Sequence, residues 1–256
     1  MAKKDIVKKK KNEVIREAQI DGENPNKFND KLKIVAGSLL IILAIVCAFL
    51  GKNNNIKNVK KENDISKFKE EYEEYNNKKN DSGTEYLNVG VSTKNNVKYS
   101  SYDEVFSLLE NGTGVIYFGF PTCPWCRNLV PVLLDSQLEA GLDKIYYLNN
   151  KEDRDTKVLE NGKIITEKEG TDNYKKLLEK LDSVLGEYKE LEDSSIKRLY
   201  FPTVIFVKDG KIVDSHIGTV SSQENPYIAL TESQYNELKE DLTNKMLKTI
   251  TCDSAC

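Results

Sequence analysis

Residues 115–126 read VIYFGFPTCPWC, and this stretch decides the fold that we expect. Its first six residues are rich in β-branched and aromatic side chains, a run typical of a strand that is buried on both faces. Two cysteines, Cys123 and Cys126, follow directly and lie three positions apart. Because the intervening Pro124 is favoured in the first turn of a helix, the cysteine pair is predicted to open a helix.

Beyond the cysteine pair, the pattern continues as a helix and a second strand. The helix is predicted to run from Cys123 to about Ala140, where Gly141 ends it, and the strand from Lys144 to Leu148. A strand, a helix and a strand in this order form a βαβ unit with the CxxC motif at the start of its helix. This unit predicts the α/β fold class.

A CxxC motif in this position can perform thiol–disulfide exchange. The start of a helix carries free N–H groups and a partial positive charge, which stabilise a thiolate on Cys123. We therefore expect Cys123 to form a mixed disulfide with a substrate and the more buried Cys126 to resolve it. Pro124 and Trp125 are expected to tune the stability of the disulfide relative to the dithiol.

A second cysteine pair, Cys252 and Cys256, lies in the C-terminal tail over 251–256. On a continuous helix their Cβ atoms would be about 5–6 Å apart, so a disulfide, which needs roughly 3.8 Å, requires a frayed helix. The pair either exchanges electrons with the CxxC motif or forms a local staple or two idle thiols. The CxxC motif itself has two alternatives to a redox centre. One is a zinc site made by both cysteine pairs, and the other is a purely structural disulfide. We expect no metal and no other cofactor.

The rest of the domain is predicted from shorter patterns. The predicted elements are short strands over 86–91 and 97–99, a helix after the capping box at Ser101, a hairpin over 204–217 with Asp209-Gly210 at its turn, and a last helix from the capping box at Thr231 to about Ile250. Residues 150–198 are polar, with one helix predicted from Tyr174 to about Leu191, and are interpreted as a helical insertion. Together these elements predict a domain over 84–250 with a central mixed β-sheet flanked by helices.

Three features of this domain resemble the thioredoxin superfamily. They are the strand, CPWC motif and helix over 115–140, the proline Pro131 eight residues after the first cysteine, and the FPT sequence before the hairpin. The resemblance implies a thioredoxin-like fold and a cis-proline loop that packs against the CxxC motif and binds substrate backbone. The alternative for this loop is a trans proline that begins an edge strand. The substrate-binding residues implied by the resemblance are Phe201, Pro202 and Thr203.

The sequence also departs from the family pattern. Family members often carry a buried aspartate six residues before the first cysteine, where it assists proton transfer, and this chain has Tyr117 there. The Pro-Trp dipeptide is neither the Gly-Pro of thioredoxin nor the Pro-His of strongly oxidising enzymes. The direction of the redox reaction is therefore left open. The insertion is interpreted either as one side of a substrate groove or as surface decoration.

An apolar run precedes the domain. Residues 34–50 include 17 positions without a charge, which predicts a single transmembrane helix over 34–51. Residues 1–33 hold ten Lys/Arg and six Asp/Glu, so the positive-inside rule places the N-terminus in the cytoplasm and the catalytic domain outside the cell. A cleaved signal peptide and a lipoprotein signal with Cys47 are the alternatives. Residues 52–83, rich in Asn, Lys and Glu, are interpreted as a polar spacer, in which the stretch from Ile65 to Tyr75 is a candidate helix.

The anchor adds a second, narrower resemblance. The stretch YFGFPTCPWC, the Lys-rich tail and the single anchor resemble membrane-anchored bacterial thioredoxin-like proteins, including the bacteriocin transport accessory group. This resemblance implies a location in the cell membrane and exported cysteine-containing proteins or peptides as substrates. A membrane electron donor or acceptor is a further partner that it implies.

Composition argues against several other classes of function. Residues 52–256 hold 28 Lys/Arg and 35 Asp/Glu, an acidic balance that argues against nucleic-acid binding. His216 is the one histidine, which excludes His-rich metal sites and disfavours a Cys–His protease, and we expect it to be structural. Outside the apolar run the four cysteines fall in two close pairs, which suits an oxidising compartment.

Two functions other than an enzyme remain open. A thioredoxin-like binding module would hold a secreted peptide at the Pro202 loop without turnover. A structural protein of the cell envelope would keep its function after the loss of Cys123 and Cys126.

Overall fold

A five-stranded sheet forms the centre of the computed structural model, which describes residues 64–94 and 96–250. In spatial order the strands are β1 (Val97–Tyr99), β3 (Ile145–Leu148), β2 (Gly114–Phe118), β8 (Thr203–Lys208) and β9 (Lys211–Ile217). The first three are parallel, while β8 and β9 run antiparallel to their neighbours. The predicted central mixed sheet is confirmed.

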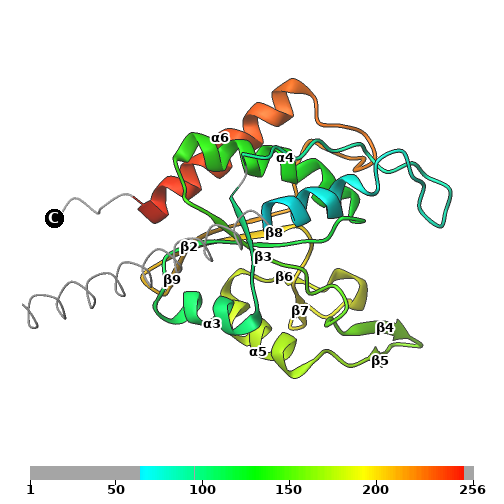
Figure 1. The fold of residues 1–256 in the computed structure, drawn as a ribbon. Helices are drawn as coiled ribbons and strands as arrows, with labels where there is room; N and C mark the ends of the chain where they lie inside the picture. The colour runs from blue at the N-terminus through cyan, green and yellow to red at the C-terminus, as the bar shows by residue number, and fades with distance from the viewer. Residues whose placement is uncertain (1–63, 95, 251–256) are drawn as a thin grey trace, which may run out of the picture. The chain divides into compact units, whose positions relative to one another are not determined.

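Helices cover both faces of this sheet (Figure 1). One face packs against α4 (Pro124–Ala140), α6 (Glu232–Ile250) and a helix over residues 64–73, and the other against α3 (Tyr102–Asn111) and α5 (Asp172–Leu181). All residues of β2 are buried, because successive side chains of a strand point to opposite faces and here both faces are covered. Val115 and Tyr117 point to the α4 side, and Ile116 and Phe118 to the α3 side.

Short-range signals in the sequence are confirmed at the ends of these elements. The Ser101 side chain accepts a hydrogen bond from the Glu104 N–H, and the Glu104 carboxylate accepts one from the Ser101 N–H, which completes the capping box of α3. Gly141 ends α4 in the left-handed conformation, with φ of 67°. Asp209 and Gly210 both have positive φ, as a two-residue hairpin turn between β8 and β9 requires.

Within the predicted spacer over 52–83, the candidate helix is confirmed, but the interpretation of residues 64–73 as a spacer is wrong. Residues 64–73 form a helix, and its Phe68 and Tyr72 are 0% exposed in the same core cluster as Cys126. Two aromatic residues four positions apart share one helix face, so this single stripe buries a helix that is otherwise rich in Glu and Lys. The folded domain therefore begins before residue 84 and includes the helix over residues 64–73.

The predicted strand over 86–91 is also wrong. This segment joins no sheet, and side chains from the preceding helical region bond to its backbone instead. The Asn76 side chain donates to the carbonyl of Val89 and accepts from its N–H, and the Glu73 carboxylate accepts from the N–H of Val91. The alternating apolar residues Val89 and Val91 are buried, but the segment does not pair with another strand.

The insertion over 150–198 is only partly helical. It contains a hairpin of β4 (Thr156–Glu160) and β5 (Lys163–Lys168), then α5, then β6 (Gly186–Glu187) paired with β7 (Lys197–Arg198). Short 3-10 turns lie at Asp182–Val184 and Lys189–Leu191. The helix predicted from Tyr174 to about Leu191 is therefore wrong beyond Leu181, where α5 ends and the first 3-10 turn follows.

Several predictions fall outside the described residues. These are the cytoplasmic tail over 1–33, the anchor over 34–51, the first part of the spacer, and the C-terminal cysteine pair. Within the part of the chain that the structure describes, no helix is long and apolar enough to cross a membrane.

Candidate functional site

The CxxC motif lies at the start of α4, as predicted. Cys123 is the N-cap residue, and its sulfur accepts a hydrogen bond from the Cys126 N–H at 3.3 Å. Pro124 occupies the first turn, where its missing N–H costs nothing. Both cysteines are buried, free thiols in this structure.

The two thiols differ in their electrostatic environment. The pKa of Cys123 is lowered, chiefly by a hydrogen bond with the Cys126 thiol and further by the backbone N–H groups of Cys126 and Trp125 and by the charge of Arg154. Burial opposes these effects at Cys123, which is 4% exposed, and it raises the pKa of the 0% exposed Cys126 well above the ordinary value. Cys123 is therefore suited to act as the nucleophile, and Cys126 as the thiol that stays protonated until it is used.

The pH dependence of alkylation tests this asymmetry. Because a lowered pKa forms the thiolate at lower pH, we expect Cys123 to react with iodoacetamide with a midpoint below the roughly pH 8.5 of a free thiol. Cys126→Ala should move the midpoint upward, while Cys126→Ser, which keeps a hydroxyl donor, should move it less. Mass spectrometry of the Cys123 peptide follows the reaction. A midpoint at or above that of a free thiol would contradict a stabilised thiolate.

The loop before β8 lies against the cysteine pair. The Phe201–Pro202 peptide bond is cis, so the alternative of a trans proline is wrong. The carbonyl oxygen of Phe201 lies 3.7 Å from the Cys123 sulfur, and the Thr203 hydroxyl donates to the Tyr200 carbonyl at 2.7 Å. Pro202 and Thr203 are buried, while Phe201 is half-buried. The three predicted loop residues are thus brought next to the CxxC motif.

Half-buried aromatic rings surround the cysteine pair. The rings of Phe120 and Phe201 meet edge to face with centroids 5.2 Å apart, and Trp125 packs against the same core cluster as both cysteines. Such rings offer apolar contact to a bound peptide, which suits binding of an extended chain beside Cys123.

Tyr117 occupies the position where members of the thioredoxin superfamily often carry a buried aspartate. Its hydroxyl lies 2.7 Å from that of Tyr72, and it also interacts with the thiol of Cys126. Burial raises the pKa of Tyr117 well above its ordinary value, so the phenol stays protonated and can donate to a Cys126 thiolate. The absence of a side chain at Gly119 leaves room for the Tyr117 hydroxyl, because a Cβ atom on residue 119 would lie 2.2 Å from it.

Arg127, directly after the motif, is a residue that sequence reasoning missed. It is 0% exposed and donates to the carbonyls of Leu87, Tyr72 and Pro121 at 2.6, 2.8 and 3.0 Å and to the Asn76 side chain at 2.6 Å. It thereby ties α4 to the residues before β1. The sequence did offer a signal of this role, because Arg127 is a charged residue within an otherwise largely apolar stretch of α4.

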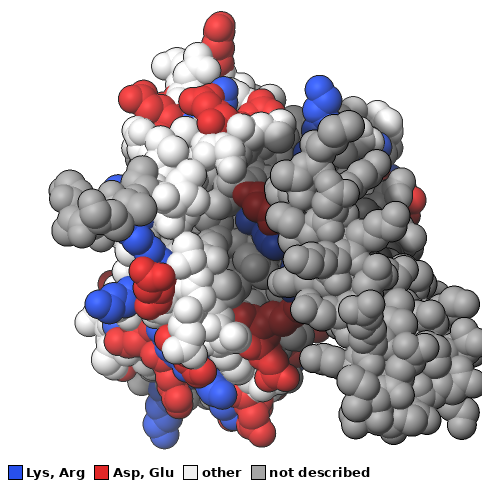
Figure 2. Space-filling view, turned by 60° about the vertical axis from the view of Figure 1, so that its left-hand side comes forward, with Lys and Arg blue, Asp and Glu red and all other residues white. Residues whose placement is uncertain are grey.

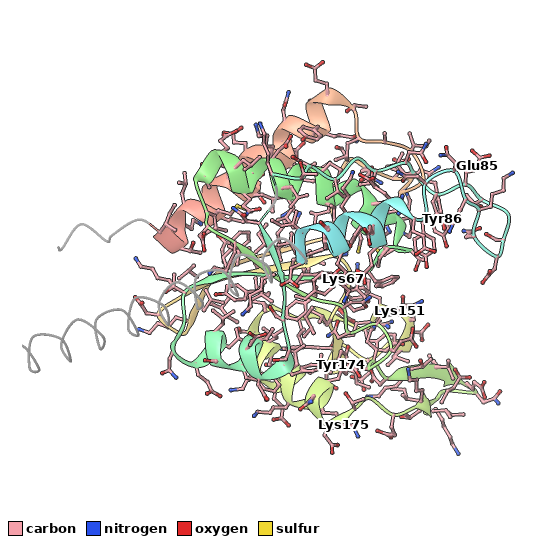
Figure 3. All side chains as sticks on the ribbon, in the orientation of Figure 1. Lys67, Glu85, Tyr86, Lys151, Tyr174 and Lys175 are labelled. Atoms are coloured by element: carbon pink, nitrogen blue, oxygen red, sulfur yellow. The ribbon has the colours of Figure 1, made fainter. Side chains whose placement is uncertain are left out.

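Arg154 was also missed, and it lies beside the nucleophile. Its guanidinium carbon is 4.7 Å from the centroid of the Phe201 ring, and its charge lowers the pKa of Cys123. Figure 3 shows the nearby Lys151 and Tyr174 on the same side of the sheet, in the insertion that also carries Arg154. Nothing in the local sequence pattern distinguishes Arg154 from the other charges of the insertion.

His216 is a structural residue as expected, and the C-terminal cysteine pair lies outside the described residues. His216 Nδ1 lies 2.8 Å from Asp241 Oδ2, and burial followed by the charge of Lys245 lowers the pKa of His216, which leaves it neutral at pH 7. Among residues 64–94 and 96–250, no group of three or more His, Cys, Asp or Glu side chains could hold a metal ion. Cys252 and Cys256 are not described.

No protein-family model matches this sequence, and no curated protein matches it either. The chemistry of the site is therefore inferred from its own geometry.

Proposed function

We propose that this protein is a thiol–disulfide oxidoreductase of the thioredoxin superfamily, anchored in the cell membrane and acting on exported proteins or peptides outside the cytoplasm. One observation carries the proposal. Cys123 caps α4 with a lowered pKa, beside a fully buried Cys126 and against the Phe201–Pro202 loop. A nucleophilic thiol, a resolving thiol and a place for a peptide backbone are what disulfide exchange requires.

The reaction follows from this asymmetry. The Cys123 thiolate attacks a substrate disulfide, the S–S bond breaks, and one substrate thiolate leaves as a mixed disulfide forms. Cys126 then loses its proton and attacks the Cys123 sulfur, which releases the second substrate thiolate. The substrate gains two electrons and the protein becomes a disulfide; the reverse sequence oxidises a substrate dithiol. Tyr117 would hold the Cys126 thiolate by hydrogen bonding during resolution.

Trapping of the mixed disulfide tests the proposal. In the full-length chain, Cys126→Ser removes the resolving thiol, so we expect substrates to accumulate on Cys123 as adducts that a reducing agent releases. Non-reducing gels and mass spectrometry detect them. The matched control, Cys123→Ser with Cys126→Ser, should give none. Absence of adducts in the single variant would overturn the enzymatic function.

The reduction potential of the pair sets the direction of the reaction. It should be measured in the full-length chain with Cys47, Cys252 and Cys256 changed to Ser. A value between about −120 and −180 mV would indicate an oxidase or isomerase, and one near about −270 mV a reductase supplied by a membrane donor.

The low exposure of Cys123 favours one second candidate, a binding module. A thiol that is 4% exposed could lie at the base of a peptide site without taking part in exchange. A Cys126→Ser chain that binds secreted peptides but forms no adducts would support this candidate.

A further inference from the structure

The insertion over 150–198 places cations on the aromatic rings around the redox site. The guanidinium of Arg154 lies 4.7 Å from the centroid of Phe201, and that of Arg198 lies 5.5 Å from the centroid of Tyr200 and 3.9 Å from that of Tyr188. Phe201 and Tyr200 are the two residues directly before the cis proline. Both arginines therefore flank the loop whose carbonyl faces the Cys123 sulfur.

Each of the two arginines has a donor without a partner. The Nε atoms of Arg154 and Arg198 are buried without a hydrogen-bond partner, and Arg154 also interacts with the hydroxyl of Tyr174. A buried donor without a partner is costly, so a bound group that accepts a hydrogen bond from it would lower that cost. A guanidinium presents parallel donors that match a carboxylate.

The carboxylates next to Arg154 in the sequence have other partners. Their partners are Tyr102 for Asp153 at 3.0 Å, Lys157 for Asp155 at 3.4 Å, and Lys151 for Glu152 at 3.7 Å. Figure 2 shows one face of the molecule, on which both acidic and basic side chains occur. Recognition of a charged group beside Cys123 depends on Arg154, which the fold places on the ring of Phe201.

We propose that Arg154 binds a substrate carboxylate beside the reactive cysteine, so that the substrates are cysteine-containing peptide segments with an adjacent acidic residue. This inference rests on the proposed function. A mixed disulfide at Cys123 lays the substrate chain along Phe201, whose ring Arg154 covers, so an acidic side chain next to the substrate cysteine meets the guanidinium. The insertion thereby acts as a specificity element.

Matched peptides test the preference. Three peptide disulfides that differ only in Glu, Gln or Lys next to the cysteine are reduced by the full-length reduced chain. We expect the Glu peptide to react about tenfold faster than the Lys peptide, with the ratio falling toward one at about 1 M salt. Arg154→Gln should lower the ratio several-fold. Because this variant also raises the pKa of Cys123 for every peptide, the ratio and not the rate is decisive.

Lys163→Gln is the matched control. It removes one positive charge from the exposed strand β5 and should leave the ratio unchanged. Equal rates for the Glu and Lys peptides, or an unchanged ratio in Arg154→Gln, would overturn the inference while leaving the proposed function intact.

A binding measurement separates recognition from exchange. Trp125 is the sole tryptophan of the chain and lies within the motif, so its fluorescence reports on the site. Peptides with Ser in place of Cys cannot exchange, and we expect the Glu form to titrate this signal at lower concentration than the Lys form. If the Glu form binds more tightly but the cysteine peptides do not exchange, the proposed function is rejected and the site for an acidic residue is retained. Equal titration by both forms would reject the site.

Discussion

Replacing Arg127 with methionine is expected to destabilise the protein by about 3–5 kcal/mol, measured by urea unfolding of the reduced chain. The side chain is fully buried and supplies hydrogen bonds to three backbone carbonyls and the Asn76 side chain. Without these donors, each buried oxygen loses its partner at a cost of about 1–3 kcal/mol. The methionine variant avoids the free-energy cost of removing a guanidinium from water on folding, which offsets part of this loss.

Two variants make this result specific. Arg127→Lys keeps the charge, but its ammonium group lacks the planar set of donors with which the guanidinium reaches four acceptors. Its free energy of unfolding should therefore lie between those of wild type and Arg127→Met. Lys163→Met removes a positive charge from an exposed strand and should change the free energy of unfolding by less than about 0.5 kcal/mol. A loss below about 1 kcal/mol in Arg127→Met would show that the buried hydrogen bonds contribute little.

Deletion of residues 1–83 is expected to prevent cooperative folding, whereas a chain that begins at Lys60 should fold. The longer deletion removes Phe68 and Tyr72, which are 0% exposed in the core beside Tyr117 and Tyr147. Truncating one buried aromatic side chain costs about 3–5 kcal/mol. Two such losses reach the total stability of a typical domain, about 5–15 kcal/mol.

Thermal unfolding followed by near-ultraviolet circular dichroism compares the two truncated chains. The 60–256 chain should show one cooperative transition and the 84–256 chain none. Phe68→Ala in the full-length chain should lower the free energy of unfolding by about 3–5 kcal/mol, which links the effect to core packing. Equal transitions in both truncated chains would show that residues 64–83 are dispensable for the fold.

The sequence by itself determined the elements that depend on neighbouring residues. These signals act within one strand or one helical turn. They are the β-prone run over 115–120, the proline inside the CxxC motif, the capping boxes at Ser101 and Thr231, and the Asp-Gly turn. Their physical causes are backbone propensity and local hydrogen bonding, which are readable at short range. The α/β class and the placement of Cys123 and Cys126 therefore followed from the sequence.

The tertiary structure alone decided which distant residues complete the site. Tyr72 meets Tyr117, Arg127 bonds to Leu87, and Arg154 lies on the ring of Phe201. Each contact joins segments about 40 or more positions apart in the chain, and the two tyrosines are separated by 45 positions. Burial of an arginine, or of one aromatic stripe on a charged helix, depends on the partner that covers it, and no local pattern specifies that partner.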